Sequence, residues 1–157
     1  MNIATLLIPP RELRVDSILV TTTRITVIAT ITKAQATCPK CKAPSRRVHS
    51  RYLRTVADLP WQGVAVHLEL SARRFFCRKA SCPQRIFCER PPALVAPHAR
   101  RTIRLNAALQ RVSFALGGGA GARLAGELAM TTSPDTLLRR IRQALLPSPR
   151  APGVGCR

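Results

Sequence analysis

Apolar and polar residues alternate along two neighbouring stretches near the start of the chain, residues 13–20 and 24–32. In the second stretch Ile25, Val27, Ala29 and Ile31 fall on one side of an extended chain, and three of the four residues that alternate with them are threonines. Alternation with a period of two is typical of a strand that buries one face. The pattern therefore predicts a β-hairpin, with three threonines as its connection.

A further strand is predicted from Val64 to Phe76, because Val66, Leu68 and Leu70 alternate there with more polar residues. Just before this strand, residues 58–63 contain proline and glycine and predict a turn. The residues that precede the turn carry no pattern from which a strand is assigned.

The second half of the chain has helical spacing. Residues 91–99 contain three prolines and predict a linker. Apolar residues then recur at helical intervals from Thr102 until three glycines, 117–119, end the first helix. Two more helices are predicted at residues 120–129 and 134–146.

The last helix has two distinct faces. Ser133 is a suitable N-cap, and Pro134 after it fits the first helical position. The predicted buried stripe consists of Leu137, Ile141, Ala144 and Leu145. The opposite face carries Thr136, Arg139, Arg140 and Gln143. Such a face suits the reading helix of a helix-turn-helix, since Arg and Gln can contact base edges and Thr a phosphate. The alternative is an ordinary three-helix bundle with a solvated basic face.

Four cysteines occur as two close pairs, Cys38-Pro39-Lys40-Cys41 and Cys77 with Cys82. A predicted strand leads toward each pair. Two such pairs supply the four thiolates of a tetrahedral zinc site, so one structural Zn²⁺ on Cys38, Cys41, Cys77 and Cys82 is predicted. The alternatives are buried free thiols or a redox pair. A redox pair needs a βαβ setting, whereas the first pair lies in a short turn.

Three other side chains bear on this site. Cys88 follows a predicted short strand at Ile86-Phe87 that is expected to carry it away from the metal, although it lies close enough in sequence to replace a ligand. His49 is expected at a turn or on the surface, with replacement of a cysteine ligand as the alternative. Cys156 lies in a Pro/Gly-containing tail that is predicted to be disordered and is expected to be a free thiol.

These patterns predict an α+β chain, in which a small β-rich, zinc-ribbon-like module precedes a three-helix, helix-turn-helix module. The predicted divisions are an N-terminal hairpin region (1–37), a four-cysteine zinc domain (38–90), a linker (91–99), a helix-turn-helix domain (100–146) and a tail (147–157). With 157 residues and only 4% aromatics, the cores must be modest, and a metal would supplement them.

The net charge of the chain indicates a class of binding partner. The chain has 26 Lys and Arg residues against 7 Asp and Glu residues, a net charge of +19. Sixteen of the basic residues and three of the acidic ones lie between residues 40 and 111, a net +13. A field of this kind, centred on the cysteines, favours nucleic acid as the partner. A solvated basic surface and a membrane surface are the alternatives. The expected DNA contacts are Lys40, Lys42, Arg46, Arg47, Arg73, Arg74, Arg78, Thr136, Arg139, Arg140 and Gln143.

Several short segments together resemble the start of ISL-three-type insertion-sequence transposases. The matching segments are Cys38-Pro39-Lys40-Cys41, Arg47-Val48-His49-Ser50-Arg51-Tyr52, Asp58-Leu59-Pro60, Arg73-Arg74-Phe75-Phe76-Cys77 with Cys82, Ile86-Phe87 with Glu89-Arg90, and Ser133 to Arg140. The resemblance implies a zinc finger and a helix-turn-helix that bind double-stranded DNA at the terminal inverted repeats of a transposon.

The family's DDE catalytic domain follows the helix-turn-helix, and this sequence stops before that region. The seven acids are also scattered singly, whereas two-metal strand transfer needs several carboxylates held together. We therefore expect a truncated, non-catalytic transposase fragment. It is expected in the bacterial cytoplasm at the nucleoid, because the chain has no membrane span or signal peptide. An RNA-binding zinc ribbon and a metal- or redox-responsive repressor are the competing functions. The DNA sequence recognised and any self-association stay open.

Overall fold

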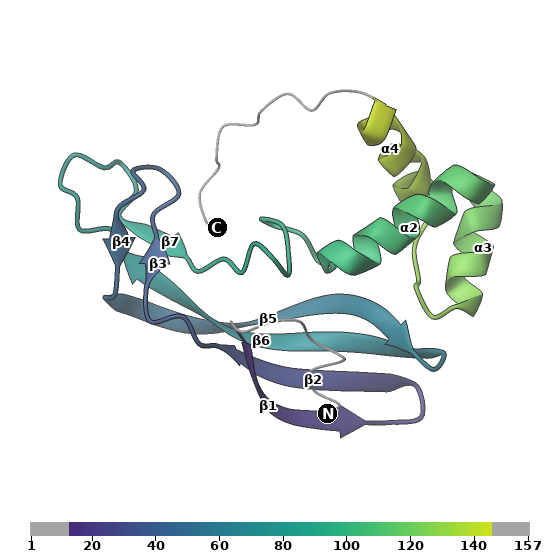
Figure 1. Ribbon diagram of the computed structural model, residues 1–157, viewed down its shortest axis with the longest axis horizontal. Helices are drawn as coiled ribbons and strands as arrows, with labels where there is room; N and C mark the ends of the chain where they lie inside the picture. Colours follow the sequence, from purple (N-terminus) through teal and green to yellow (C-terminus); the bar gives the residue numbers. More distant parts are fainter. Residues whose placement is uncertain (1–12, 146–157) are drawn as a thin grey trace.

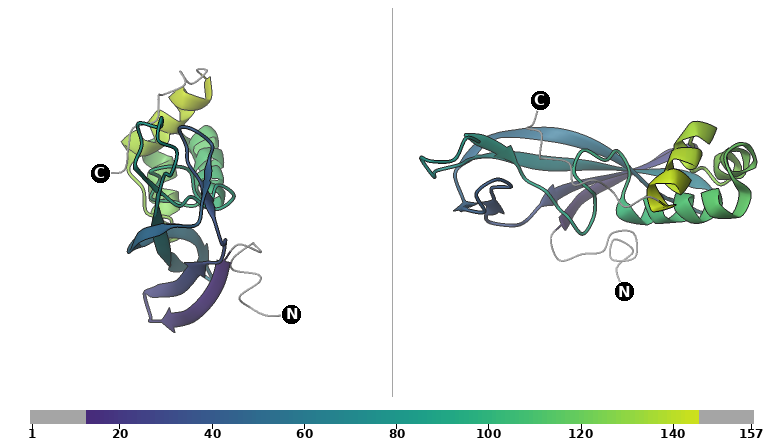
Figure 2. Two further views of the ribbon diagram at one scale, coloured as in Figure 1. Left: turned by 90° about the vertical axis from the view of Figure 1, so that its left-hand side faces the viewer. Right: turned by 90° about the horizontal axis from the view of Figure 1, so that it is seen from above.

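The computed structural model describes residues 13–145. Its β-rich part is a long twisted sheet with a small two-stranded sheet at one end, and three helices lie over the other end (Figures 1 and 2). This arrangement confirms the predicted α+β class. Among the described residues, no helix is both long enough and apolar enough to cross a membrane. The predicted tail at 147–157, with Cys156, lies outside the described residues.

Five strands make up the main sheet, in the order β1-β2-β6-β5, with β7 pairing with β6 as well. Their bounds are β1 (Leu13–Val20), β2 (Arg24–Ile31), β5 (Val48–Trp61), β6 (Val64–Phe76) and β7 (Ile86–Cys88). All pairs are antiparallel except β2 with β6, which is parallel. The two remaining strands, β3 (Ala36–Thr37) and β4 (Pro44–Ser45), form the small sheet.

The predicted hairpin is confirmed as β1 and β2, with the second strand ending one residue early, at Ile31. It does not stand apart from the strands around the cysteines. Ile25 of β2 lies opposite Val66 of β6, and both are buried. The hairpin therefore extends the sheet that carries the second cysteine pair, and the division predicted at residues 37 and 38 stays a prediction.

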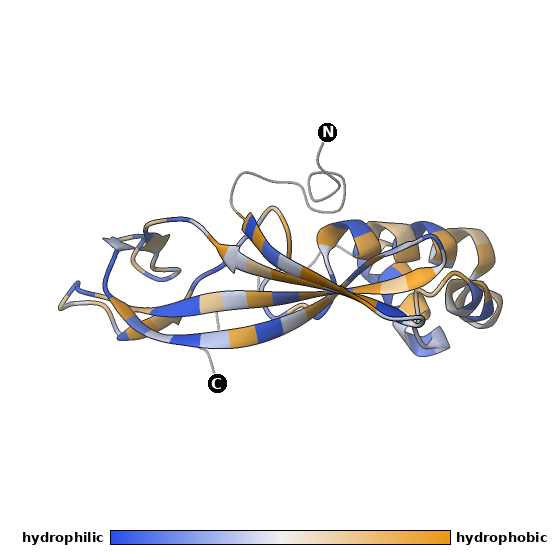
Figure 3. Cartoon of the chain, turned by 90° about the horizontal axis from the view of Figure 1, so that it is seen from below, coloured by the Kyte–Doolittle hydropathy of each residue, from blue (hydrophilic) through white to orange (hydrophobic). Residues whose placement is uncertain are grey.

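Strand β5 was not predicted, although it has 14 residues and pairs along most of β6. Side chains on its inner face change along the strand from Tyr52 and Arg54 to the buried Val56. On its outer face Leu53 is 71% exposed. Because neither face is uniformly apolar, the sequence of this strand shows no alternation of apolar and polar residues. The strand is formed by its antiparallel pairing with β6, which runs from Val48 to Trp61. Figure 3 views the sheet from below and shows hydrophilic and hydrophobic residues mixed along its strands.

The main core lies on the inner face of the sheet, between β2, β5 and β6 and the segment that follows β7. Val27, Val56 and Leu68 are central to it. Leu94 and Val95 also belong to this cluster and are 4% and 2% exposed. Residues 91–99, predicted as a linker, therefore contribute to the core, and they run along the sheet toward the helices (Figure 1).

The three predicted helices are confirmed as α2 (Ile103–Leu116), α3 (Gly119–Glu127) and α4 (Pro134–Leu145). Their core contains Leu105, Leu109, Ala125, Met130 and Leu137. In the predicted stripe of α4, Leu137 is buried and Ile141 half-buried, but Ala144 is exposed because it lies in the last turn, beyond the other helices.

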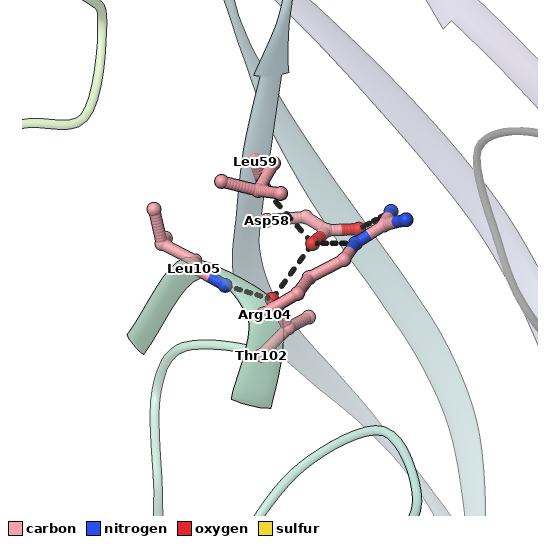
Figure 4. A network of polar contacts seen from close by, with 5 residues as sticks. All are labelled: Asp58, Leu59, Thr102, Arg104 and Leu105. Carbon is pink, nitrogen blue, oxygen red and sulfur yellow. Dashed lines mark hydrogen bonds and ion pairs between the residues drawn. The ribbon is translucent and has the colours of Figure 1, made fainter. Parts of the chain in front are cut away.

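Helix α2 is joined to the sheet by a buried carboxylate. Asp58 of β5 accepts hydrogen bonds through Oδ1 from Thr102 Oγ1 and Arg104 Nε, both at 2.7 Å, and its Oδ2 pairs with Arg104 Nη2 (Figure 4). The N–H of Leu59 completes the set at 2.8 Å. Thr102 Oγ1 in turn accepts the N–H of Leu105 and so caps the helix. The carboxylate thus fixes the start of α2 on β5.

Candidate metal centre and basic surfaces

The first cysteine pair lies at the tip of the β3–β4 hairpin. The N–H of Cys38 donates to the carbonyl of Ala43 at 2.9 Å, and the N–H of Lys42 donates to the carbonyl of Cys38 at 3.0 Å. Lys42 has a φ of 61°, in the left-handed region. These features close a tight turn that directs both sulfurs to one side. The prediction that a hairpin presents this pair is confirmed, but the hairpin is β3–β4 and not the longer β1–β2.

The second pair lies between β6 and β7. The N–H of Cys77 donates to the carbonyl of Arg85 at 2.7 Å, and the N–H of Cys82 donates to the carbonyl of Lys79 at 3.0 Å. This knuckle projects beside the first one because β6 ends next to the β3–β4 hairpin (Figure 1). Each pair therefore comes from its own hairpin, as a zinc ribbon requires.

The four thiols converge. Their sulfur atoms all lie within 4.8 Å of one another, with Cys38 and Cys82 at 3.9 Å and Cys41 and Cys77 at 3.5 Å. Four sulfurs about 2.3 Å from a tetrahedral Zn²⁺ lie about 3.8 Å apart. The donor set and spacing thus fit one structural zinc, which would cross-link the two hairpins. Within the described residues, this is the one group of Cys, His, Asp or Glu side chains that could hold a metal.

The surroundings of the cluster support metal binding in two ways. Phe75 and Phe87 stack beneath it with ring centroids 6.0 Å apart, and both are fully buried. They form an apolar base that shields one side of the site. The second feature is that backbone groups of Ala43 and Lys79 donate hydrogen bonds to the sulfurs of Cys41 and Cys77. Such bonds favour the thiolate, which is the form that binds a metal.

Proton affinity differs between two of the thiols. The backbone N–H of Ala43, as a hydrogen-bond donor, lowers the pKa of Cys41 to about 7 despite its desolvation. The backbone of Lys79 acts in the same direction on Cys77, but burial and the neighbouring thiols, Cys41 first, raise the pKa of Cys77 to about 12. One thiol of this touching pair therefore ionises before the other. A bound cation would favour the thiolate at both.

The two alternative ligands are not part of the cluster. His49 is exposed, and its Nδ1 lies 3.0 Å from Ser50 Oγ, while its ring packs edge-on against Phe76. Cys88 ends strand β7, where the predicted strand has carried it away from the four sulfurs. The four predicted cysteines are thus the ones that the fold brings together.

The basic residues predicted near the cysteines fall into two groups. Five are exposed, namely Lys40, Lys42, Arg46, Arg47 and Arg78. Arg47 also lies over the ring of Phe76, at 5.0 Å. Arg73 and Arg74 are half-buried and have partners within the fold. The guanidinium of Arg73 binds the carboxylate of Glu89 at 2.6 Å, which raises the pKa of the arginine. Arg74 covers the ring of Tyr52 at 4.7 Å.

The predicted reading face of α4 also contains both exposed side chains and side chains with partners in the fold. Arg139 and Gln143 are exposed, whereas Thr136 is half-buried and its hydroxyl lies 2.9 Å from Ser133 Oγ at the helix start. Arg140 is directed toward α2, where its Nη2 donates to Asn106 Oδ1 at 2.5 Å. Its Nε is buried without a partner among the described residues. Burial lowers the pKa of Arg140, and the positive charges of Arg101 and Arg139 add to this effect.

Comparison with known proteins gives a family match in the cysteine-containing segment. Residues 34–83 match the family model described as the zinc-finger of transposase IS204/IS1001/IS1096/IS1165. This segment contains all four clustered cysteines, so residues 34–83 carry the ISL3-type transposase zinc finger. No curated protein and no solved structure matches the chain.

Proposed function

We propose that this protein binds the double-stranded DNA of transposon ends and that, alone, it does not catalyse cleavage or joining. The single observation that carries the proposal is the transposase zinc finger at residues 34–83, with its four cysteines in zinc geometry within the most basic part of the chain. A structural zinc would hold the two knuckles together, so that their charged side chains face one ligand.

The exposed residues around the knuckles are suited to phosphate contacts. Lys40 and Lys42 lie on the first knuckle and Arg78 on the second, and all three are exposed. Arg46 and Arg47 lie on the strand-linking segment beside them. Contacts of this type supply affinity and salt dependence without reading sequence.

Sequence reading is assigned to the helical part. Arg139 and Gln143 are exposed one turn apart on α4, as base-edge donors must be. Thr136 at the start of the helix suits a phosphate contact. Arg73 and Arg140 are weaker candidates for DNA contact, because Glu89 and Asn106 already hold their guanidiniums. Six residues, 128–133, join α3 to α4, which is longer than the 3–4-residue turn of a helix-turn-helix.

The buried carboxylates support the non-catalytic part of the proposal. Asp58 pairs with Arg104, and Glu89 pairs with Arg73, so both acids stabilise the fold. Two-metal strand transfer needs several carboxylates gathered around the ions. In the described part of the chain, the only candidate metal group consists of thiols.

The test is binding of the zinc-loaded protein to fluorescent duplexes with candidate transposon-end sequences and with scrambled sequences, over a range of salt concentrations. The expected result is a preference for the end sequence and affinity that falls steeply with salt. Equal binding to single-stranded RNA and duplex DNA would instead favour an RNA-binding zinc ribbon.

A second assay addresses catalysis. Supercoiled plasmid with candidate ends is incubated with the protein and Mg²⁺ or Mn²⁺, and we expect no nicked or joined product. Nicking that co-purifies with the protein through successive columns, and that is absent from a mock preparation, would contradict the non-catalytic assignment.

A further inference from the structure

A cavity of about 350 Å³ opens between the inner face of the sheet and the segment at residues 96–100. Its basic and aromatic lining, among the described residues, consists of Tyr52, Arg54, Arg74, Arg90, His98 and Arg100. Only Arg74 of these was predicted as a DNA contact. The volume lies within the range of about 300–1,000 Å³ of small-ligand sites.

The fold builds this cavity at the point where the inner face of the sheet changes from apolar to polar. Arg54 pairs in register with Leu70, and the next inward residue of β5, Val56, already belongs to the core. Tyr52 lies two residues in the other direction and so shares this face. The apolar core therefore ends at Arg54, and the cavity begins there.

Backbone and side-chain hydrogen bonds hold the segment over the cavity. The N–H of Ala57 donates to the carbonyl of Arg100 at 2.9 Å. Arg54 Nη2 donates to the carbonyl of Ala99 at 2.5 Å, which leaves its other N–H groups available. His98, at the rim, has a φ of 61°, in the left-handed region. Arg54 and Arg74 thus come from paired strands, and the hydrogen bonds to the carbonyls of Ala99 and Arg100 hold the segment that carries Arg100 against β5.

The charge inside the cavity is not balanced. Among residues 13–145, four guanidiniums line it, and the one acidic lining residue is Glu89. The carboxylate of Glu89 is already bound by Arg73, at 2.6 Å and 3.0 Å. None of the ion pairs described for residues 13–145 includes a cavity arginine, since these pairs join Arg14 to Asp16, Arg73 to Glu89 and Arg104 to Asp58. Like charges gathered in a concave, partly desolvated site favour an anion.

One of the arginines is also held in place. The guanidinium of Arg74 lies 4.7 Å from the centroid of the Tyr52 ring, a cation–π contact. An arginine fixed in this way loses little side-chain entropy when it binds a phosphate, and its planar fork matches phosphate oxygens.

We infer that this arginine-lined cavity binds a phosphate group, namely a phosphodiester of the bound DNA. The chemistry of the phosphate follows from the cavity, and its origin in DNA rests on the proposed function. The cavity would thus anchor the backbone between the zinc finger and the helices.

The test uses the full-length zinc-loaded protein with two matched double variants. Arg90→Gln with Arg100→Gln removes two charges from the cavity and leaves Arg54 and Arg74, which make contacts within the fold. Arg24→Gln with Arg51→Gln removes two charges from exposed positions whose register places them on the opposite face of the sheet. Thermal unfolding of both variants checks that the fold is retained.

For duplex DNA, we expect the cavity variant to lose about tenfold in affinity, as for a charged hydrogen bond. Its salt dependence should flatten by about one unit of slope for one lost phosphate contact. The variant of the opposite face should change both quantities less. Equal losses in the two variants would show a general effect of net charge and overturn the inference.

A second arm uses backbone NMR spectra titrated with inorganic phosphate and with a 5′-phosphorylated dinucleotide. Shifts at Arg54 and His98 in the wild type, lost in the cavity variant, are expected. A response to the dinucleotide alone identifies a nucleotide unit, and a response to both ligands identifies a simple phosphate site. Absence of any response at these residues would overturn the inference.

The two arms separate the hypotheses. If the wild-type protein fails to bind duplex DNA, the proposed function fails, and the NMR titration still decides whether the cavity binds phosphate. If duplex binding is strong but insensitive to the cavity variant, the proposed function stands and the cavity inference fails.

Discussion

At the scale of single residues, the sequence identified the metal ligands from their local spacing, but it did not show which side chains pair over long distances in the chain. The two cysteine pairs were identified as ligands because a short loop between thiols limits where the sulfurs can point. In contrast, Arg73 and Arg140 looked like free basic side chains. Their partners, Glu89 and Asn106, lie 16 and 34 residues away and were visible only once β7 paired with β6 and α4 packed on α2.

Loss of one ligand should disrupt the zinc site. We expect Cys77→Ser to remove most of the bound zinc and to unfold the two hairpins, because metal binding and folding are coupled in small sites of this kind. Zinc content by mass spectrometry and far-UV circular dichroism are the measurements. Cys156→Ser is the control and should keep one zinc per chain. A stoichiometric zinc content in the Cys77 variant would refute the four-cysteine site.

Removal of the charge on Asp58 should weaken the connection between β5 and α2. Asp58→Asn leaves the half-buried Arg104 without its carboxylate partner, and the expected loss is about 1.5–3 kcal/mol in the free energy of unfolding. The measurement is the midpoint of urea denaturation.

Asp16→Asn is the control for this substitution. Asp16 is also paired with an arginine, but Arg14 is largely exposed, and the hydrogen bond at 2.6 Å from Thr30 Oγ1 can be accepted by the Asn oxygen, so a smaller change is expected. Similar midpoints for the two variants would mean that the buried ion pair does not stabilise the junction.

At the scale of elements, hydropathy predicted those strands and helices that bury one apolar face. β2, β6 and the three helices were found because their apolar residues recur at regular intervals, whereas β1 was found from a shorter alternation that a bulge between Val15 and Ser17 interrupts. β5 was missed because its inner face combines part of the core with part of the charged cavity, from Val56 to Tyr52. The change from apolar to charged residues also hid the cavity, whose lining comes from β5, β6, β7 and the segments that follow β7, most of which were predicted as a linker.

Close packing of α3 against α4 depends on a glycine. A Cβ at Gly121 would lie 2.9 Å from Leu137 Cδ1, and Leu137 is fully buried. Gly121→Ala should therefore destabilise the helical part by about 1–3 kcal/mol, as overpacking does. Thermal and urea denaturation measure the effect.

The same helix offers the matched control. Gly126 has nothing within 4 Å of the position of a Cβ, so Gly126→Ala should stabilise the helix by about 0.5–1 kcal/mol. Opposite signs for the two substitutions are the expected outcome. If both were stabilising, the contact between α3 and α4 would be looser than the structure shows.

At the scale of the whole molecule, the sheet acts as a spacer between two basic ends. The cysteine cluster lies at one end of the long strands and α4 near the other (Figures 1 and 2). Because Asp58 fixes α2 on β5, the two ends keep a defined separation. Composition and charge predicted a polyanion as partner, whereas this separation follows from the length and pairing of β5 and β6, and β5 was not predicted.

This arrangement predicts a division of labour on DNA that two double variants can separate. Arg139→Ala with Gln143→Ala removes the exposed candidates for base contact on α4, and Lys40→Ala with Arg78→Ala removes one exposed charge from each knuckle. The α4 variant should weaken binding to the end sequence more than to a scrambled duplex, by about 1–3 kcal/mol for each good bidentate contact. The knuckle variant should weaken binding to both duplexes equally.

Salt titration of both variants completes the argument. Loss of phosphate contacts at the knuckles should reduce the slope of affinity against salt concentration by about one unit per contact. The α4 variant should change this slope less, because Gln143 carries no charge. If the α4 variant instead lost affinity for the two duplexes to the same extent, α4 would be only a second basic surface. The reading of sequence would then have to come from the zinc end, where Lys40 and Arg78 lie.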